Sequence, residues 1–309
     1  MADSSDTPIR VICGPTAGGK TSTAVSFARV ADISIVSADS RQLYRGFDVG
    51  TAKPTVREQL AAPHLGVDVL EPTERASAAW WAEQADGWID EVVAQGRTPI
   101  VVGGTGLYLR ALFGTLFEEP PMDAGDRLAI QASLADHTTE ELRRWVTELD
   151  PERAHLGRTQ LLRAIEVALL TGRRMSDLHR ENRRAPRRRA RYLVVDPGAS
   201  LAWNIESRVS HMIGSGWPEE VDHLLRTVPL DAPAWNASGY RTIREAVEGR
   251  LDWAETTQRI VIETRQYAKR QRTWFRHQLV GEDVTHFSDA EPDWEERLMT
   301  WWKGEETNA

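Results

Sequence analysis

The feature that constrains this chain most is a phosphate loop, the sequence GPTAGGKT at positions 14–21. It matches the pattern G-x-x-x-x-G-K-[ST], in which glycines let backbone N–H groups approach phosphate oxygens and a lysine adds positive charge. The hydrophobic residues 9–13 before the loop predict a strand, and residues 21–30 after it predict a helix. This context predicts that the whole loop binds phosphate, namely Gly14, Pro15, Thr16, Ala17, Gly18, Gly19, Lys20 and Thr21, with Thr21 also a ligand of Mg²⁺.

Strands and helices continue to alternate beyond the loop. Residues 33–36 and 99–102 predict buried strands, and the spacing of apolar residues over 78–95 predicts a helix between them. This alternation is typical of helices packed on both faces of a parallel sheet. We therefore expect an α/β fold, a P-loop doubly wound parallel sheet.

The middle of the chain has a different pattern. Residues 123–191 show only helical spacing, and residues 192–196 then resume as a strand. A helical domain inserted into the α/β domain accounts for this order. We predict a catalytic core of residues 1–119 and 192–309, with C-terminal helices, and a helical, arginine-rich insertion at residues 120–191. The later helices are predicted at 201–214, 218–225, 240–248 and 256–278.

Two further polar turns follow predicted strands. Asp39 follows the strand at 33–36, and the sequence GGTG at 103–106 follows the strand at 99–102. The carboxyl ends of parallel strands meet at the ligand crevice, so both turns should lie near the phosphate loop. In that position Asp39 could act as a metal ligand, as a general base or only as a helix cap.

Four segments, in order, give the chain a resemblance to a known family. They are GPTAGGKT (14–21), SADSRQLYRGFDVGTAKPT (37–55), VVGGTGLYLRAL (101–112) and TRQYAKRQRTWFR (264–276). Together they resemble the tRNA dimethylallyltransferase family, the tRNA isopentenyl transferases. The resemblance implies an enzyme that transfers a dimethylallyl group from dimethylallyl diphosphate to N6 of the adenosine 3′ of the anticodon in tRNA.

The resemblance also implies roles at the donor site. The phosphate loop would hold the diphosphate together with Mg²⁺, and Arg208 matches a family arginine at that diphosphate. Asp39 matches the general base that takes a proton from N6, and Thr16 matches a residue that positions the reacting groups. An ordinary arginine on a helix surface is the alternative for Arg208.

The family flips the adenosine out of the anticodon stack into a channel, which implies residues that contact tRNA. The matching positions here are Asp39, Ser40, Arg41, Gln42, Thr105, Arg127, Gln160, Leu161, Leu162, Arg163, Ser238, Gly239, Tyr240 and Arg241. For Leu161 and Leu162, packing in a hydrophobic core is an equal alternative. The implied partners are the anticodon stem-loop and dimethylallyl diphosphate, and the implied oligomeric state is a monomer.

The chain departs from the family pattern in two places. The family usually has two histidines after a proline, where this chain has only His64, so we give His64 a structural role. In the insertion, the family often has a stretch like Asn-Pro-Arg-Arg, where this chain has Gly-Arg-Thr-Gln at 157–160. The second departure leaves the detailed tRNA contacts open, and neither changes the expected chemistry.

The net charge of −8 argues at first against a nucleic-acid partner, because polyanions attract basic surfaces. However, residues 158–191 hold eleven arginines and three acids, a net charge of +8, and residues 259–276 have a net charge of +5. Arginine makes paired contacts with phosphate and stacks on bases. We therefore predict that the insertion binds tRNA, that the basic loop at 183–191 orders on phosphate, and that the acidic residues 282–306 avoid RNA.

The remaining features exclude other classes of protein. A single cysteine, Cys13, excludes an intrachain disulfide and a cysteine-based zinc site, and it fits a reducing cytoplasm. No apolar run approaches the length of a membrane span, so we expect no membrane partner. Three alternatives stay open: a P-loop small-molecule kinase that uses ATP, an enzyme that prenylates free adenine nucleotides, and a non-catalytic RNA-binding protein with a vestigial phosphate site.

Overall fold

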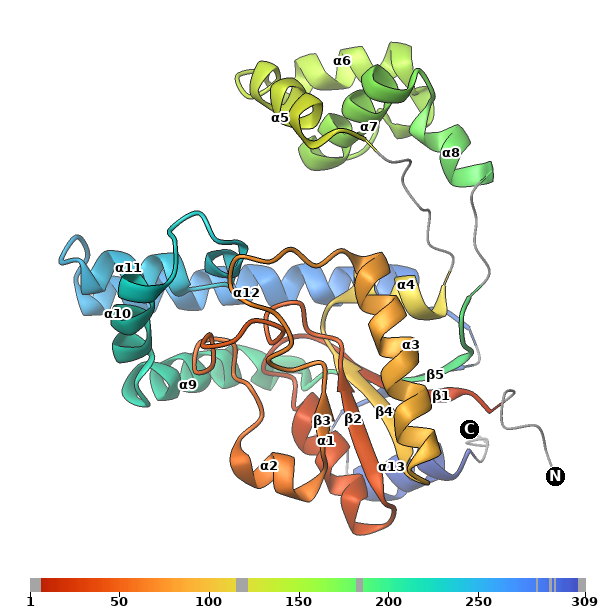
Figure 1. Cartoon of the computed structure of the whole chain (residues 1–309). Helices are drawn as coiled ribbons and strands as arrows, with labels where there is room; N and C mark the ends of the chain where they lie inside the picture. Colours follow the sequence, from red (N-terminus) through yellow and green to blue (C-terminus); the bar gives the residue numbers. More distant parts are fainter. Residues whose placement is uncertain are drawn as a thin grey trace. The chain divides into compact units, whose positions relative to one another are not determined.

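The structure is a computed structural model that describes residues 7–114, 122–181, 186–281, 283–288, 291 and 293–304. The chain divides into two compact units, one made of residues 1–113 and 187–309 and the other of residues 114–186. The first unit carries a sheet, and the described part of the second unit is helical (Figure 1). Residues 187–191, which we expected in the insertion, belong to the first unit.

The sheet of the first unit contains six parallel strands within the described residues, in the order β3-β2-β4-β1-β5-β6. Their bounds are β1 Ile9–Cys13, β2 Ile33–Ser37, β3 His64–Leu65, β4 Thr98–Gly103, β5 Ala190–Val195 and β6 Val284–Phe287. The chain runs from β1 toward β2 on one side and reaches β5 on the other side of β1. The strand order therefore reverses next to β1, and a doubly wound sheet binds its ligands at that point. The predicted fold class is confirmed.

Helices surround this sheet and extend from it (Figure 1). Those of the first unit are α1 Lys20–Ser26, α2 Val56–Ala61, α3 Ala78–Ala94, α4 Gly106–Phe113, α9 Leu201–Gly214, α10 Trp217–Thr227, α11 Tyr240–Val247, α12 Trp253–Gln278 and α13 Trp294–Lys303. The described helices of the second unit are α5 Ala124–Ser133, α6 Thr139–Leu149, α7 Arg158–Thr171 and α8 Met175–Glu181.

The two faces of the sheet are covered by different helices. On one face, Ile12, Ile35 and Ile100 join a buried cluster with residues of α1 and α13, where Phe27 stacks on Trp302 at 4.4 Å between ring centroids. A second pair of helices, α3 and α4, packs together through Trp81, which stacks on Tyr108 at 4.7 Å. The Trp81 indole also donates a hydrogen bond to the carbonyl oxygen of Ser37, at 3.1 Å. This bond fixes α3 to the carboxyl end of β2.

The second unit has its own hydrophobic core. Leu142 and Val146 of α6 pack against Leu161 and Ile165 of α7, and all four side chains are completely buried. A capping box at Thr138 begins α6, because its side chain accepts the N–H of Glu141 while the Glu141 carboxylate accepts the N–H of Thr138. These contacts account for helices at the positions that the apolar spacing predicted.

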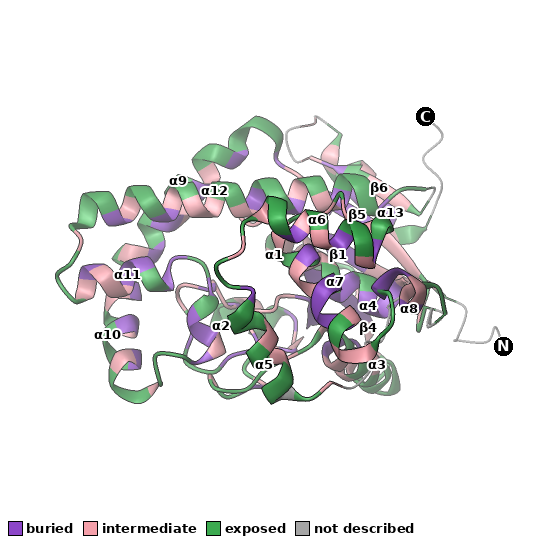
Figure 2. Cartoon of the chain, turned by 90° about the horizontal axis from the view of Figure 1, so that it is seen from above, coloured by how far each residue is buried: buried purple, intermediate pink, exposed green. Residues whose placement is uncertain are grey.

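Several elements were not predicted, among them β3, β6, α2, α4 and α13. The strand β6 lies in the acidic C-terminal region, where its four residues give too short a signal, and it forms by pairing with β5. The helix α4 begins at the end of the glycine turn after β4, and α2 begins at a capping box formed by Thr55 and Glu58. In the long helix α12, buried positions recur every three to eight residues, and much of the rest is exposed (Figure 2).

Within the described residues, no helix is both long and apolar enough to cross a membrane.

Candidate active site

The phosphate loop leaves the carboxyl end of β1 and turns sharply into α1. Ala17 (φ 58°) and Gly19 (φ 86°) both have left-handed backbone conformations, which form a concave arrangement of N–H groups suited to an anion. At Gly14, any side chain would collide with the carbonyl oxygen of Val195, because a Cβ atom would lie 2.1 Å away. A glycine there allows the loop to rest against the end of β5.

Two cations stand beside this loop. The ammonium of Lys20 donates a hydrogen bond to the carbonyl oxygen of Pro15, at 2.7 Å. Burial, followed by the positive charge of Arg208, lowers the pKa of Lys20 to about 8, although Asp39 acts in the opposite direction. Burial also lowers the pKa of Arg208. Two confined positive charges of this kind attract a multiply charged anion.

The turn that carries Asp39 is held by hydrogen bonds on both sides. The N–H of Thr105 donates to the carbonyl of Ala38 at 3.1 Å, and the hydroxyl of Thr105 accepts the N–H of Ser40 at 3.1 Å. One carboxylate oxygen of Asp39 accepts the N–H of Arg41 at 2.9 Å. The structure therefore brings the glycine turn after β4 against the turn after β2, as the sheet order predicts.

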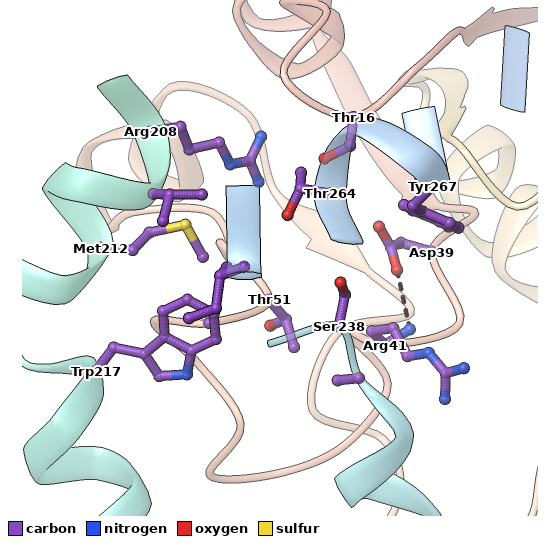
Figure 3. A pocket seen from close by; sticks show the side chains of 14 residues that line it. Thr16, Asp39, Arg41, Thr51, Arg208, Met212, Trp217, Ser238, Thr264 and Tyr267 are labelled. Atoms are coloured by element: carbon purple, nitrogen blue, oxygen red, sulfur yellow. Dashed lines mark hydrogen bonds between the residues drawn. The ribbon is translucent and has the colours of Figure 1, made fainter. Parts of the chain in front are cut away.

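Two cavities meet at Asp39. The larger, of about 320 Å³, is lined by the phosphate loop from Thr16 through Ser22 and by Lys53. The smaller, of about 80 Å³, has an apolar wall made of Val209, Met212, Trp217, Ala237 and Ile260. Four residues line both cavities: Thr16, Asp39, Arg208 and Tyr267. Figure 3 shows Thr16, Asp39 and Tyr267 on one side of the smaller cavity, and Arg208, Met212 and Trp217 on the other.

Three polar residues of α12 that line the cavities were not predicted, although they lie within the segment 264–276. Thr264, Tyr267 and Gln271 line one or both cavities. Their spacing of three and four places them on one face of the helix, and polar groups at that spacing were the available signal. Burial raises the pKa of Tyr267.

The residues predicted to contact tRNA in the first unit occupy different environments. Arg41 and Ser238 line the smaller cavity, whereas Gln42 lines the larger one and donates to the carbonyl of Ala52 at 3.0 Å. Arg241 is exposed and donates to Asn236 at 2.6 Å. Ser40 and Thr105 bond to each other, as described above.

Two predicted tRNA contacts in this unit are buried. Tyr240 is completely buried, and its hydroxyl donates to Glu220 at 2.6 Å. Gly239 is also buried, and a Cβ atom at that position would lie 2.3 Å from the ring of Trp217. The side chain of Tyr240 therefore belongs to an aromatic cluster and is not exposed to a tRNA surface. Burial argues against a direct contact between the Tyr240 side chain and tRNA.

The residues of the second unit that were predicted to contact tRNA also include both buried and exposed side chains. Arg127 and Arg163 both pair with the buried carboxylate of Glu166, at 2.6 and 2.5 Å. The favourable hydrogen bonds from both arginines overcome the burial of Glu166, and they lower its pKa. Leu161 is completely buried in the core, as the packing alternative for this residue expects, whereas Gln160 is exposed and Leu162 is partly buried.

In the basic segment 187–191, which follows the second unit, some arginines are already paired with acidic side chains. Arg188 donates to Asp86 at 2.6 Å and to Asp90 at 2.7 Å, both on α3. Arg187 lies 3.5 Å from the same Asp86. Arg183 and Arg184 lie outside the described residues. Arg188 therefore already has acidic partners on α3.

The metal assignment depends on one side chain. Thr21 lines the larger cavity at the start of α1. Within the part of the chain that the structure describes, no group of three or more His, Cys, Asp or Glu side chains could hold a metal ion. Mg²⁺ commonly binds through few protein oxygens and completes its shell with phosphate oxygens and water. The residues present therefore fit a Mg²⁺ ion that arrives with a phosphate ligand.

Two other residues named in the sequence analysis, His64 and Cys13, lie outside the cavities. His64 lies in β3, and its Nδ1 atom is 2.8 Å from the carbonyl oxygen of Ala62. Cys13 ends β1, is completely buried, and has no cysteine partner because it is the only cysteine in the chain.

Comparison with known proteins places this site in a family context. The IPP transferase family model matches residues 42–278, and the isopentenyl transferase model matches residues 7–63. A tRNA dimethylallyltransferase of Gloeobacter violaceus is 42% identical over 277 residues, which cover 87% of this chain and 89% of the relative. One from Thermomicrobium roseum is 40% identical and covers 94% of this chain and 89% of the relative.

Solved structures agree in fold. The tRNA delta(2)-isopentenylpyrophosphate transferase of Staphylococcus epidermidis is 27% identical, with a TM-score of 0.66 over 96% of this chain and 98% of that one. A eukaryotic dimethylallyltransferase that acts on tRNA has a TM-score of 0.79 at 21% identity, over 98% of this chain and 81% of that one. At that identity the second likeness concerns the fold alone.

Proposed function

The chain belongs to the IPP transferase family and is a tRNA-modifying prenyltransferase; on that premise we propose that it transfers a dimethylallyl group from dimethylallyl diphosphate to N6 of the adenosine 3′ of the anticodon. The observation that carries the proposal is the junction of two unlike cavities at Asp39. One is polar and lined by the phosphate loop, and the other has an apolar wall. This pair suits a donor with a diphosphate head and a short hydrocarbon tail.

Charge on the leaving diphosphate is the main electrostatic demand of this reaction. In the proposed step, the nitrogen lone pair of N6 attacks C1 of the dimethylallyl group as the C1–O bond breaks, and the bonding electrons leave with the diphosphate. Lys20, Arg208 and the N–H groups of the phosphate loop would stabilise that charge. A bound Mg²⁺, held by the Thr21 hydroxyl and the phosphate oxygens, would supply further charge neutralisation.

Asp39 would supply the base. The exocyclic nitrogen of adenine is a weak nucleophile, so a positioned proton acceptor and an aligned allylic carbon are both required. The proton lost by N6 would pass to the carboxylate of Asp39, which lies on the wall shared by both cavities. Thr16 lines the same junction and would help to align the diphosphate with the acceptor.

The acceptor must leave the anticodon stack to reach this junction. We expect the flipped adenosine to approach along Ser40, Arg41 and Ser238, where polar side chains can bond to its edges and to flanking bases. The arginines of residues 158–191 would contact the phosphates of the anticodon stem-loop. Because Arg127 and Arg163 form ion pairs with the buried carboxylate of Glu166, we do not expect these two arginines to be the main phosphate contacts.

Mass analysis of tRNA incubated with the protein, Mg²⁺ and dimethylallyl diphosphate tests this function. We expect the mass of one dimethylallyl group to appear on an anticodon-loop oligonucleotide, and not on free AMP supplied in a parallel reaction. Prenylation of AMP without prenylation of tRNA would favour the enzyme that acts on free nucleotides. Phosphate transfer from ATP without prenylation would favour the small-molecule kinase.

A further inference from the structure

Gln271 connects two loops that carry the reacting groups. Its side-chain oxygen accepts the backbone N–H of Thr16 at 2.8 Å, and its side-chain nitrogen donates to the carbonyl of Gly104 at 2.9 Å. The orientation of the amide is fixed by these partners, because a backbone N–H can only donate and a carbonyl can only accept. The residue is 6% exposed, so neither bond is easily replaced by one to bulk water.

The connection continues from Gly104 to both sides of Asp39. The next residue, Thr105, bonds to Ala38 through its N–H and to Ser40 through its hydroxyl. Asp39 lies between those two partners. One side chain of α12 is thereby linked to the donor side at Thr16 and, through the glycine turn, to the acceptor side at Asp39.

The glycine turn is shaped for this contact. A Cβ atom on Gly104 would lie 2.2 Å from the side-chain nitrogen of Gln271, so a larger residue would displace the amide. The next turn of α12 makes a similar approach, because a Cβ atom on Gly106 would lie 2.4 Å from the ring of Trp274. Two close approaches by one helix hold the turn after β4 in a single position.

We propose that Gln271 is a positioning residue that sets the alignment between the donor at the phosphate loop and the base at Asp39. This inference rests on the proposed function. Gln271 contacts the two loops and not the reacting atoms. Loss of its side chain should therefore reduce the rate of the chemical step more than it weakens the binding of either substrate. A misplacement of about 1 Å between reacting groups can reduce a rate about a hundredfold.

The first test is the variant Gln271→Met, which keeps the length of the side chain and removes both hydrogen bonds. We expect kcat to fall by about a hundredfold, while KM for dimethylallyl diphosphate and for tRNA each change by less than about threefold. Gln266→Met is the matched control, because Gln266 is exposed on the same helix and lines neither cavity. A kcat for Gln271→Met within about twofold of the parent, or a loss confined to KM, would overturn the proposal.

A second variant keeps the proposal testable if the first one unfolds. In Gln271→Glu the carboxylate can accept from Thr16 but cannot donate to Gly104, whereas the protonated carboxyl can do both. The activity of this variant relative to the parent should therefore rise as the pH falls. A ratio that does not change with pH argues for a merely structural residue.

Hydrogen exchange separates this proposal from the proposed function. In Gln271→Met, the segments 14–21 and 103–107 should exchange faster than in the parent and in Gln266→Met. If the parent fails to prenylate tRNA, the proposed function is wrong whatever the exchange shows. If the parent is active and exchange in those segments is unchanged in Gln271→Met, only the role of Gln271 is wrong.

Discussion

The ammonium of Lys20 donates a hydrogen bond to the carbonyl of Pro15 within its own phosphate loop, at 2.7 Å. The loop thus holds its own lysine beside the anion site, in a setting that disfavours the charged form. Burial and the nearby Arg208 lower the pKa of Lys20 to about 8. A diphosphate in the cavity would favour the charged form again.

The first prediction concerns pH. Below about pH 8 the free protein carries a charged Lys20, and above it the charge is lost, so donor binding should weaken as the pH rises through that value. The limit is about tenfold per pH unit, if the neutral lysine contributes nothing. KM for dimethylallyl diphosphate, measured from pH 6.5 to 9.5 (roughly the range around that pKa), checks this. In Lys20→Arg the guanidinium stays charged, so the pH profile should flatten. An identical profile in both proteins would contradict the assignment.

The second prediction concerns Asp39. Asp39→Asn keeps an oxygen that can accept the N–H of Arg41 but removes the proton acceptor. Loss of a general base typically reduces kcat by about 10² to 10⁴, and tRNA binding should stay within about twofold of the parent. Single-turnover prenylation and a separate tRNA-binding assay check the two parts. Asp32→Asn is the control, because Asp32 is exposed and pairs with Arg97 before β2. Full activity in Asp39→Asn would favour a role in RNA binding alone.

Local signals in the sequence predicted the part of this site that lies on the turns after the strands. The phosphate loop and Asp39 each follow a strand directly, so the order of strand and turn was enough to place them at the crevice. The rest of the site comes from α12 and α9, whose residues reach the cavity only through tertiary packing. The spacing of Thr264, Tyr267 and Gln271 predicts a shared helix face, but nothing local shows what that face meets.

The tRNA-contact assignments that burial argues against have a common physical origin. Tyr240 and Leu161 lie in segments that match tRNA-contacting positions, yet both side chains are completely buried. A match of position does not show which face of a helix points to solvent. Arg188 illustrates a second reason, because its partners Asp86 and Asp90 are about a hundred residues away in the chain and cannot be recognised from the local sequence. The charge of the segment could be counted, but its neutralisation by α3 could not.

The third prediction concerns that basic segment. Replacing Arg187, Arg188 and Arg189 together with alanine should weaken tRNA binding and reduce its dependence on salt. Each phosphate contact contributes about one to the slope of log Kd against log salt concentration, and we expect the triple variant to lose about two. Arg188→Ala alone should change the slope by less than about one, because Asp86 and Asp90 already neutralise that arginine. Binding titrations at several salt concentrations check this. An unchanged slope in the triple variant would exclude the segment from the RNA surface.

The last prediction concerns the length of the donor tail. Met212 lies one helical turn beyond Arg208 on α9 and forms part of the apolar wall of the smaller cavity (Figure 3). Met212→Ala removes three side-chain heavy atoms from that wall. Binding of a ten-carbon geranyl tail in the cavity should therefore become less unfavourable. Changes of this size in a hydrophobic pocket alter selectivity by about tenfold or more. The ratio of kcat/KM for geranyl diphosphate to that for dimethylallyl diphosphate should therefore rise by about tenfold.

Met299→Ala is the matched control for that experiment, because Met299 packs in the cluster at α13 and lines neither cavity. It can lower stability, but it should leave the donor ratio unchanged. If the ratio is the same in the parent and both variants, the apolar wall does not hold the donor tail. The smaller cavity would then serve the flipped adenine, whose ring is also largely apolar on its two faces, and the diphosphate cavity alone would account for donor binding.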